Sequence, residues 1–180
     1  MNRSSRRALL AAVAIAVAVP AFVAVPPAFA QSMDQTGGTT TFVRLASLGG
    51  HFGIESSQIA LQRSRDPGVR GFAQRMIDSH GQALNDLKFT NDANANASMP
   101  QQLTGDYQAM INELRGTPDE RFDGVYMSMQ VQGHQTALAM FTDYARVGSV
   151  DSLRKLAVKW MPLIEANLKD AQTVLGAVSR

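Results

Sequence analysis

The stretch "RGFAQRMIDSHGQAL", residues 70–84, contains the pattern that decides the fold. Its apolar residues recur at intervals of three and four, which is typical of one face of an α-helix. His80 lies within this series, between Met76 and Leu84. The stretch therefore predicts an amphipathic helix that turns a histidine toward its neighbours. The apolar face comprises Val69, Phe72, Ala73, Met76, Ala83, Leu84 and Leu87.

The residues before this stretch predict a first helix that begins at Thr41. Four apolar residues with helical spacing form its stripe. The segment "RDPGV" then ends the first helix and starts the next, because Asp66 suits an N-cap and Pro67 suits the first helical position. The stripe of the first helix comprises Leu45, Leu48, Phe52 and Ile59.

The residues after it predict a break, a short helix and two further long helices. The segment "TNDANANASMP", residues 90–100, is rich in Asn and ends in proline, which indicates a loop. Residues 103–114 then suggest a short helix inside a long connection. Long helices are expected from about Asp119 to Val147 and from about Leu153 to Leu175, and Pro162 should kink the last one.

This order of elements predicts an all-α fold. No segment shows the alternation of a strand, and no internal repeat is present in the sequence. The plan is four long helices, with short first and last turns and a long crossover between the second and third that contains a short extra helix. That topology is found in ferritin-like four-helix bundles, and we expect one such domain over residues 41–178.

The N-terminus has the pattern of a cleaved signal peptide. Arg3, Arg6 and Arg7 precede an apolar run, and small residues at Ala28 and Ala30 form the exit. We expect cleavage after Ala30, a flexible leader over residues 31–40 and a periplasmic protein. Both Sec and twin-arginine export fit the sequence, because "SRRALL" resembles the start of a twin-arginine signal.

The charge of the processed chain excludes some partners. Of the 17 basic residues, three leave with the signal peptide, so 14 remain against 15 acidic ones, a net charge of −1 with neutral histidine. We therefore expect no nucleic-acid partner. We also expect no integral membrane segment after cleavage. With no cysteine in the sequence, disulfides, thiol catalysis and cysteine-ligated metals are excluded.

Four polar residues fall on the apolar stripes of the four long helices. They are Glu55, His80, His134 and Asn167, and each lies close to the middle of its own helix. Alternating helix directions would bring them to one level of the bundle. A carboxylate, two imidazoles and a weaker amide ligand could bind one divalent or transition metal ion there.

The same layer has a structural interpretation. Buried polar groups need hydrogen-bond partners, and a Glu–His–His–Asn layer can satisfy itself and fix helix register without binding anything. Asp78 and Glu165 turn away from the central stripes and are expected at the surface. The methionines at helical spacing are expected to fill the core.

Four segments of the chain resemble one family of exported bacterial proteins. They are "FVRLASLGGHFGIES", "DPGVRGFAQRMIDSH", "RFDGVYMSMQVQGHQTALAMF" and "LRKLAVKWMPLIEANLKDA". They are similar in order, over nearly all of residues 41–175, to domain-of-unknown-function family 4142. The resemblance implies a place in the ferritin-like superfamily and hence a four-helix fold.

The resemblance also implies a glutamate at position 55 and histidines at positions 80, 134 and 167. This chain has Asn167 at the last of these positions, so a strong ligand is missing. The family tends to have an acidic residue before each middle histidine, where this chain has Ser79 and Gly133. Di-iron sites need several carboxylates and Glu-x-x-His pairs, so a di-iron oxidase is not expected.

Three functions follow as hypotheses. The first is a periplasmic bundle that binds a metal ion or small ligand at mid-bundle. The second is a non-enzymatic interaction or envelope-stress protein whose buried polar layer is purely structural. The third is an oxidoreductase of ferritin-like descent. No catalytic triad order, phosphate loop or H-E-x-x-H motif is present, so the sequence favours a protein that is not an enzyme.

Overall fold

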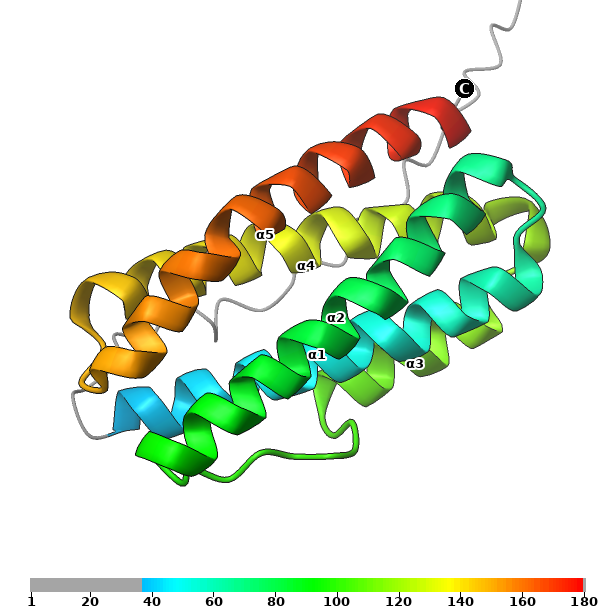
Figure 1. The fold of residues 1–180 in the computed structure, drawn as a ribbon. Coiled ribbons are helices and arrows are strands. Elements are labelled where there is room, and N and C mark those ends of the chain that lie inside the picture. Colours follow the sequence, from blue (N-terminus) through cyan, green and yellow to red (C-terminus); the bar gives the residue numbers. More distant parts are fainter. Residues whose placement is uncertain (1–36, 180) are drawn as a thin grey trace, which may run out of the picture.

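The computed structural model describes residues 37–179, which form a bundle of four long helices and one short helix (Figure 1). The described residues contain no strand, as the sequence predicts. The predicted signal peptide and most of the leader lie outside the described residues. The helices are α1 (Gly37–Arg63), α2 (Pro67–Asn94), α3 (Asp106–Gly116), α4 (Asp119–Val147) and α5 (Asp151–Val178).

Contacts at the two ends of the bundle define the helix directions. Thr39, near the start of α1, bonds the hydroxyl of Tyr144 near the end of α4, with the two oxygens 2.7 Å apart. Arg63, at the end of α1, forms an ion pair with Asp119 at the start of α4. These two helices are therefore antiparallel. The connection from α2 to α4, which contains α3, returns along the bundle, as Figure 1 shows.

Helix α1 begins at Gly37, earlier than the expected start at Thr41. The reason is a contact distant in sequence: the Thr39 hydroxyl bonds both Tyr144 and the Ser149 hydroxyl, the latter at 2.9 Å. This contact holds the first turn of α1 against the turn between α4 and α5. The Gly and Thr residues at positions 37–40 do not by themselves predict that the helix begins this early.

Helix α2 also extends beyond its predicted end, through Asn94. Its start agrees with the prediction, because the Asp66 carboxylate accepts a hydrogen bond from the Val69 amide at 2.9 Å. At its end, the buried amide of Asn91 bonds both the carbonyl and the N–H of Ala97, at 2.8 and 3.0 Å. These bonds satisfy backbone groups of the following loop and stabilise the last turn.

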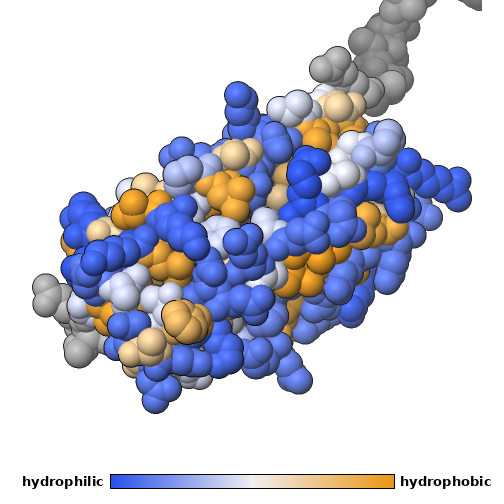
Figure 2. Space-filling view, in the orientation of Figure 1, coloured by the Kyte–Doolittle hydropathy of each residue, from blue (hydrophilic) through white to orange (hydrophobic). Residues whose placement is uncertain are grey.

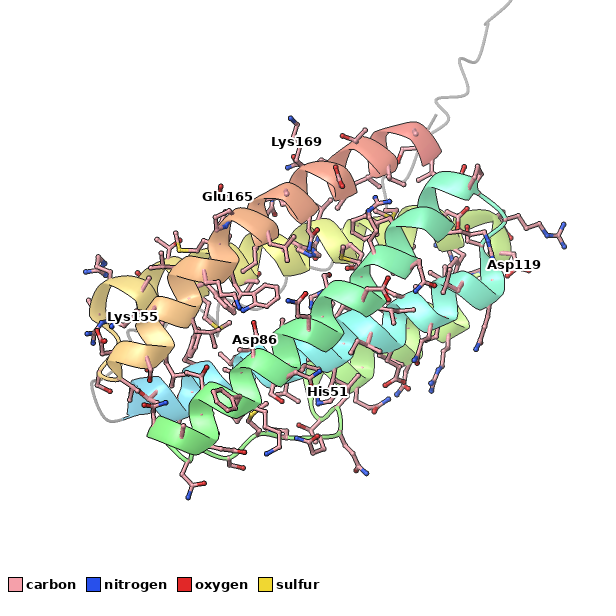
Figure 3. The ribbon with its side chains drawn as sticks, in the orientation of Figure 1. His51, Asp86, Asp119, Lys155, Glu165 and Lys169 are labelled. Atoms are coloured by element: carbon pink, nitrogen blue, oxygen red, sulfur yellow. The ribbon has the colours of Figure 1, made fainter. Side chains whose placement is uncertain are left out.

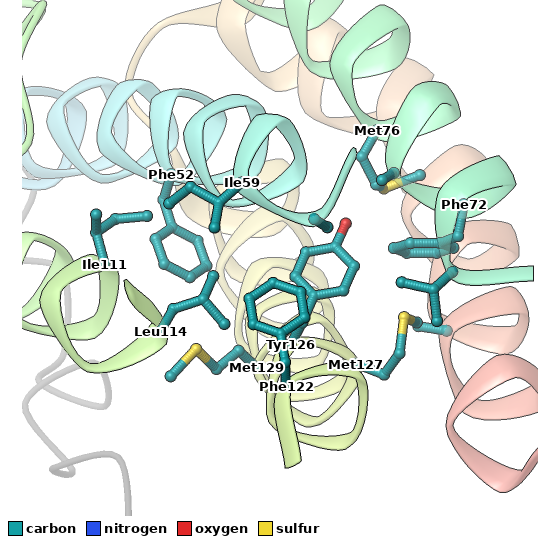
Figure 4. Close-up of a cluster of buried hydrophobic side chains, with 14 of the residues drawn as sticks. Phe52, Ile59, Phe72, Met76, Ile111, Leu114, Phe122, Tyr126, Met127 and Met129 are labelled. Atoms are coloured by element: carbon teal, nitrogen blue, oxygen red, sulfur yellow. The ribbon is translucent and has the colours of Figure 1, made fainter. Parts of the chain in front are cut away.

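Two clusters of buried side chains form the core. The larger one, shown in part in Figure 4, joins all five helices and includes the rings of Phe72, Phe122 and Tyr126. On its α1–α3 side, Phe52 and Ile59 pack toward Ile111 and Leu114 (Figure 4). The smaller cluster lies toward the other end and includes Phe42, Tyr144, Leu153 and Trp160. The two clusters of buried side chains thus lie on either side of the middle of the bundle.

Small residues of α1 let α2 approach closely. A Cβ on Gly50 would lie 2.8 Å from the side chain of Leu84, and a Cβ on Gly53 would overlap the ring of His80. Both glycines are buried. Any larger side chain would force the helices apart or displace these two residues of α2.

The outer surface is mixed in character. Figure 2 shows separate hydrophobic areas among hydrophilic side chains on the face in view. Within the described part of the chain, the exposed large hydrophobic residues are Phe89, Val147 and Val158. Among the described helices, none is long and apolar enough to cross a membrane.

The substitution Gly53→Ala tests the α1–α2 contact. We expect it to lower the free energy of unfolding by about 1–3 kcal/mol, because the new methyl group displaces the His80 ring. Gly124→Ala in α4 is the matched control, since a Cβ there meets nothing within 4 Å. That change should stabilise the helix by about 0.5–1 kcal/mol. Urea unfolding measures both, and equal effects of the two changes would contradict the close contact.

Candidate functional site

A cavity of about 140 Å³ lies in the middle of the bundle. Helices α1, α2, α4 and α5 form most of its wall, and α3 adds Tyr107 and Met110. The lining is mainly apolar, with aromatic rings and methionines beside a few polar groups. Cavities of roughly 150 Å³ with apolar walls accept benzene. The space is therefore suited to a ligand of about that size.

His134 is the most constrained polar residue of the cavity wall. It is 5% exposed, and its Nδ1 lies 2.8 Å from the carbonyl oxygen of Gln130, one turn earlier in α4. A carbonyl only accepts, so the ring donates from Nδ1. In the neutral ring, Nε2 is then an acceptor with a free lone pair. This atom is buried and has no hydrogen-bond partner among the described residues.

His134 stays neutral near pH 7. Burial lowers its pKa from the ordinary value, against an opposite effect of the hydrogen bond to Gln130. Gln130 itself is held by α1, because its Nε2 donates to the Ser56 hydroxyl at 3.0 Å. The orientation of the His134 ring is thus linked, through Gln130, to the neighbouring helix.

His80 lies beside His134 in the same wall. The two ring centroids are 5.8 Å apart, with an angle of 45° between the ring planes. Burial and then the proximity of His134 lower the pKa of His80 to about 3. Both imidazoles are therefore neutral at neutral pH. The glycine at position 53 provides the space that the His80 ring occupies.

Helix α5 contributes two further polar groups. Trp160 is 7% exposed, and its Nε1–H is buried without a hydrogen-bond partner among the described residues. Asn167 lies in the same cavity wall. An indole N–H only donates, and an amide both donates and accepts. The wall therefore combines one unpaired acceptor, His134 Nε2, with one unpaired donor, Trp160 Nε1.

The structure brings three of the four predicted residues to one cavity. His80, His134 and Asn167 line it. Glu55 lies elsewhere: its carboxylate accepts a hydrogen bond from Arg115 of α3 at 2.8 Å, and its side chain is 34% exposed. Because Gly53 faces α2, a residue two positions later is turned about 200° away. This rotation places Glu55 on the α3 side of α1.

The expected set of four metal ligands is thus not assembled as a group. Among residues 37–179, no three His, Cys, Asp or Glu side chains come together where they could hold a metal ion. The two imidazoles and the Asn167 amide are the groups of the predicted set that share the cavity. Zinc sites typically use three or four His, Cys, Asp or Glu ligands.

The other polar residues considered from the sequence lie outside the cavity wall. Asp78 is exposed and accepts a hydrogen bond from Gln74 at 3.1 Å. Glu165 is exposed on α5, where Figure 3 shows it pointing away from the bundle. His51 is partly buried on α1 and is absent from the residues that line the cavity. Asp86, also labelled in Figure 3, pairs with Lys159 at 2.6 Å and links α2 to α5.

Two components of the site were not predicted from the sequence. Gly53 and Gly50 define how closely α2 approaches, and Trp160 supplies the unpaired donor. The run "GGHFG" at residues 49–53 is the available signal, since glycines inside an apolar helical pattern often indicate close packing. For Trp160 the sequence indicates burial, and the unpaired state of its N–H depends on packing.

An all-α bundle with a mainly apolar central cavity is the class of protein that these observations define. The chain belongs to the family described as Domain of unknown function (DUF4142), whose model matches residues 24–174. The crystal structure of a DUF305 fragment from Deinococcus radiodurans is similar in fold, with a TM-score of 0.68 and 16% sequence identity. The match covers 79% of this chain and 98% of that chain. Comparison with curated proteins found no match.

The neutral state of His80 predicts a pH-dependent stability. In the unfolded chain the ring takes up a proton below about pH 6.5, whereas the folded chain resists protonation down to a pKa of about 3. The unfolded state then binds more protons, so the free energy of unfolding falls as the pH drops from 7 to 5. We expect His80 to contribute on the order of 1–2 kcal/mol to this fall.

Urea unfolding of the natural protein and of His80→Gln at pH 7 and pH 5 measures this contribution. The variant keeps every carboxylate, so the difference between the two proteins isolates His80. A smaller loss of stability in the variant is expected. The same loss in both proteins would show that the His80 ring is protonated in the folded state.

Proposed function

We propose that this protein binds one small neutral ligand in the cavity at the centre of the bundle. The observation that carries the proposal is the pair of buried, unpaired nitrogens, His134 Nε2 and Trp160 Nε1, in the wall of one cavity. Buried polar atoms in proteins nearly always have a partner, and each exception calls for an explanation. A bound ligand that hydrogen-bonds these atoms supplies one.

The absence of charge in the wall supports a neutral ligand. The described residues that line the cavity include no Asp, Glu, Lys or Arg. Both histidines are kept neutral by burial. An ionised ligand would lose its hydration without gaining a counter-charge, at a cost of several kcal/mol.

The proposal concerns binding and not catalysis. General acid–base catalysis near pH 7 needs a group whose pKa lies close to that pH, whereas the pKa of His80 lies far below it. Metal binding has less support than an organic ligand, because the Glu55 carboxylate is paired with Arg115. The proposed role is therefore that of a small-ligand-binding protein in the cell envelope.

The envelope location is part of the proposal. It rests on the basic start, the apolar run and the Ala28–Ala30 exit in residues 1–30. Protein for the binding experiment is therefore purified from the periplasmic fraction of bacterial cells that express the whole chain. An N-terminus at Gln31 is expected, and full-length protein retained in the cytoplasm would contradict export.

The substitution Ala137→Leu tests binding in the cavity. Ala137 lines the wall on α4, so the added isopropyl group fills part of the space. We expect the dissociation constant for toluene, used as an apolar ring-shaped probe, to rise about tenfold or more. Chemical-shift changes of the methionine methyl groups during a toluene titration provide the measurement.

Ala139→Leu is the matched control, because Ala139 is exposed on the opposite side of the same helix. It should leave toluene binding unchanged. If toluene binds both variants equally, the probe binds elsewhere. If no probe binds the natural protein, the polar groups of the cavity have only a structural role.

A further inference from the structure

We propose that the ligand is a small hydroxylated ring compound of the phenol type, whose hydroxyl group donates a hydrogen bond to His134 Nε2. This inference rests on the proposed function and specifies its ligand. The polar requirement comes from His134 Nε2, which is buried, has no hydrogen-bond partner among the described residues and needs a donor.

A hydroxyl group on the ring meets this requirement, because it donates its proton to His134 Nε2. A carbonyl or ether oxygen only accepts and would leave His134 Nε2 unpaired. A hydrocarbon would also leave His134 Nε2 unpaired, and an unsatisfied buried acceptor disfavours its binding.

The remaining wall suits a flat apolar ring. The cavity volume is about 140 Å³, close to the roughly 150 Å³ that accommodates benzene. Phe52, Phe141 and the Trp160 ring line it together with Met129 and Met140. Aromatic faces and thioether sulfurs both make favourable contacts with a bound ring.

The tautomer of His134 sets the direction of the hydrogen bond. Its Nδ1–H is already used by the Gln130 carbonyl, so the neutral ring has no second proton to donate. Charging the ring would give Nε2 a proton, but burial disfavours that state. The site therefore selects a ligand that donates toward His134.

Phenol and toluene form a matched pair of probes, because they differ in the group at one ring position. In the natural protein we expect phenol to bind at least about tenfold more tightly than toluene, by titration calorimetry or ligand-observed NMR. In His134→Phe, which keeps a ring of similar size, this preference should fall to about one while toluene still binds. His51→Phe is the control, since His51 lies outside the cavity wall, and it should keep the preference.

The outcomes separate the ligand class from the proposed function. If phenol and toluene bind the natural protein equally, the hydroxyl inference is wrong while cavity binding stands. If neither probe binds, the proposed function itself is wrong. A preference for phenol that persists in His134→Phe would also overturn the inference, because the hydroxyl would then be recognised elsewhere. The comparison of probes in the natural protein keeps the inference testable even if His134→Phe does not fold.

Discussion

The close approach of α1 and α2 at Gly50 and Gly53 is the contact on which the rest of the structure depends. Because α1 has no side chain at these positions, Leu84 and His80 lie directly over its backbone. This places the His80 ring beside His134 of α4, at a centroid distance of 5.8 Å. Bulkier residues would shift α2 outward and change the wall of the cavity. The packing of two helices thus defines the position of the polar groups.

Much of the fold can be predicted from the sequence, because its helices carry strong periodic and capping signals. The Asp66–Pro67 start of α2 and the extent of α4 agree with the structure. The errors occur where side-chain hydrogen bonds beyond the helix backbone hold an additional turn. Thr39 extends α1 through Tyr144, and Asn91 extends α2 through Ala97. The helix propensity of the residues at these two helix ends does not reveal such hydrogen bonds.

The candidate site was predicted in part, and the reason lies in α1. The large apolar residues Phe52 and Ile59 define a stripe that looks like the inward face, and Glu55 falls on it. In the structure Phe52 lines the cavity and also contacts Tyr107 of α3, while the glycines and serines of α1 face α2 and α4. Hydrophobic periodicity gives weight to large side chains and little weight to small ones, so it does not reveal that Glu55 turns toward α3 and the glycines toward α2. For α2, α4 and α5 the large residues do surround the cavity, and His80, His134 and Asn167 share it.

The bundle holds two imidazoles that are neutral at pH 7 in a mainly apolar cavity, and among residues 37–179 no group donates to His134 Nε2. Nitrogen-15 spectra of the histidine rings test this most directly, because protonated and unprotonated ring nitrogens have distinct chemical shifts. At pH 7 both rings should be neutral, with the proton of His134 on Nδ1, and the His80 ring should remain neutral at pH 5. A His134 proton on Nε2, or protonation of either ring near its ordinary pKa of about 6.5, would contradict it.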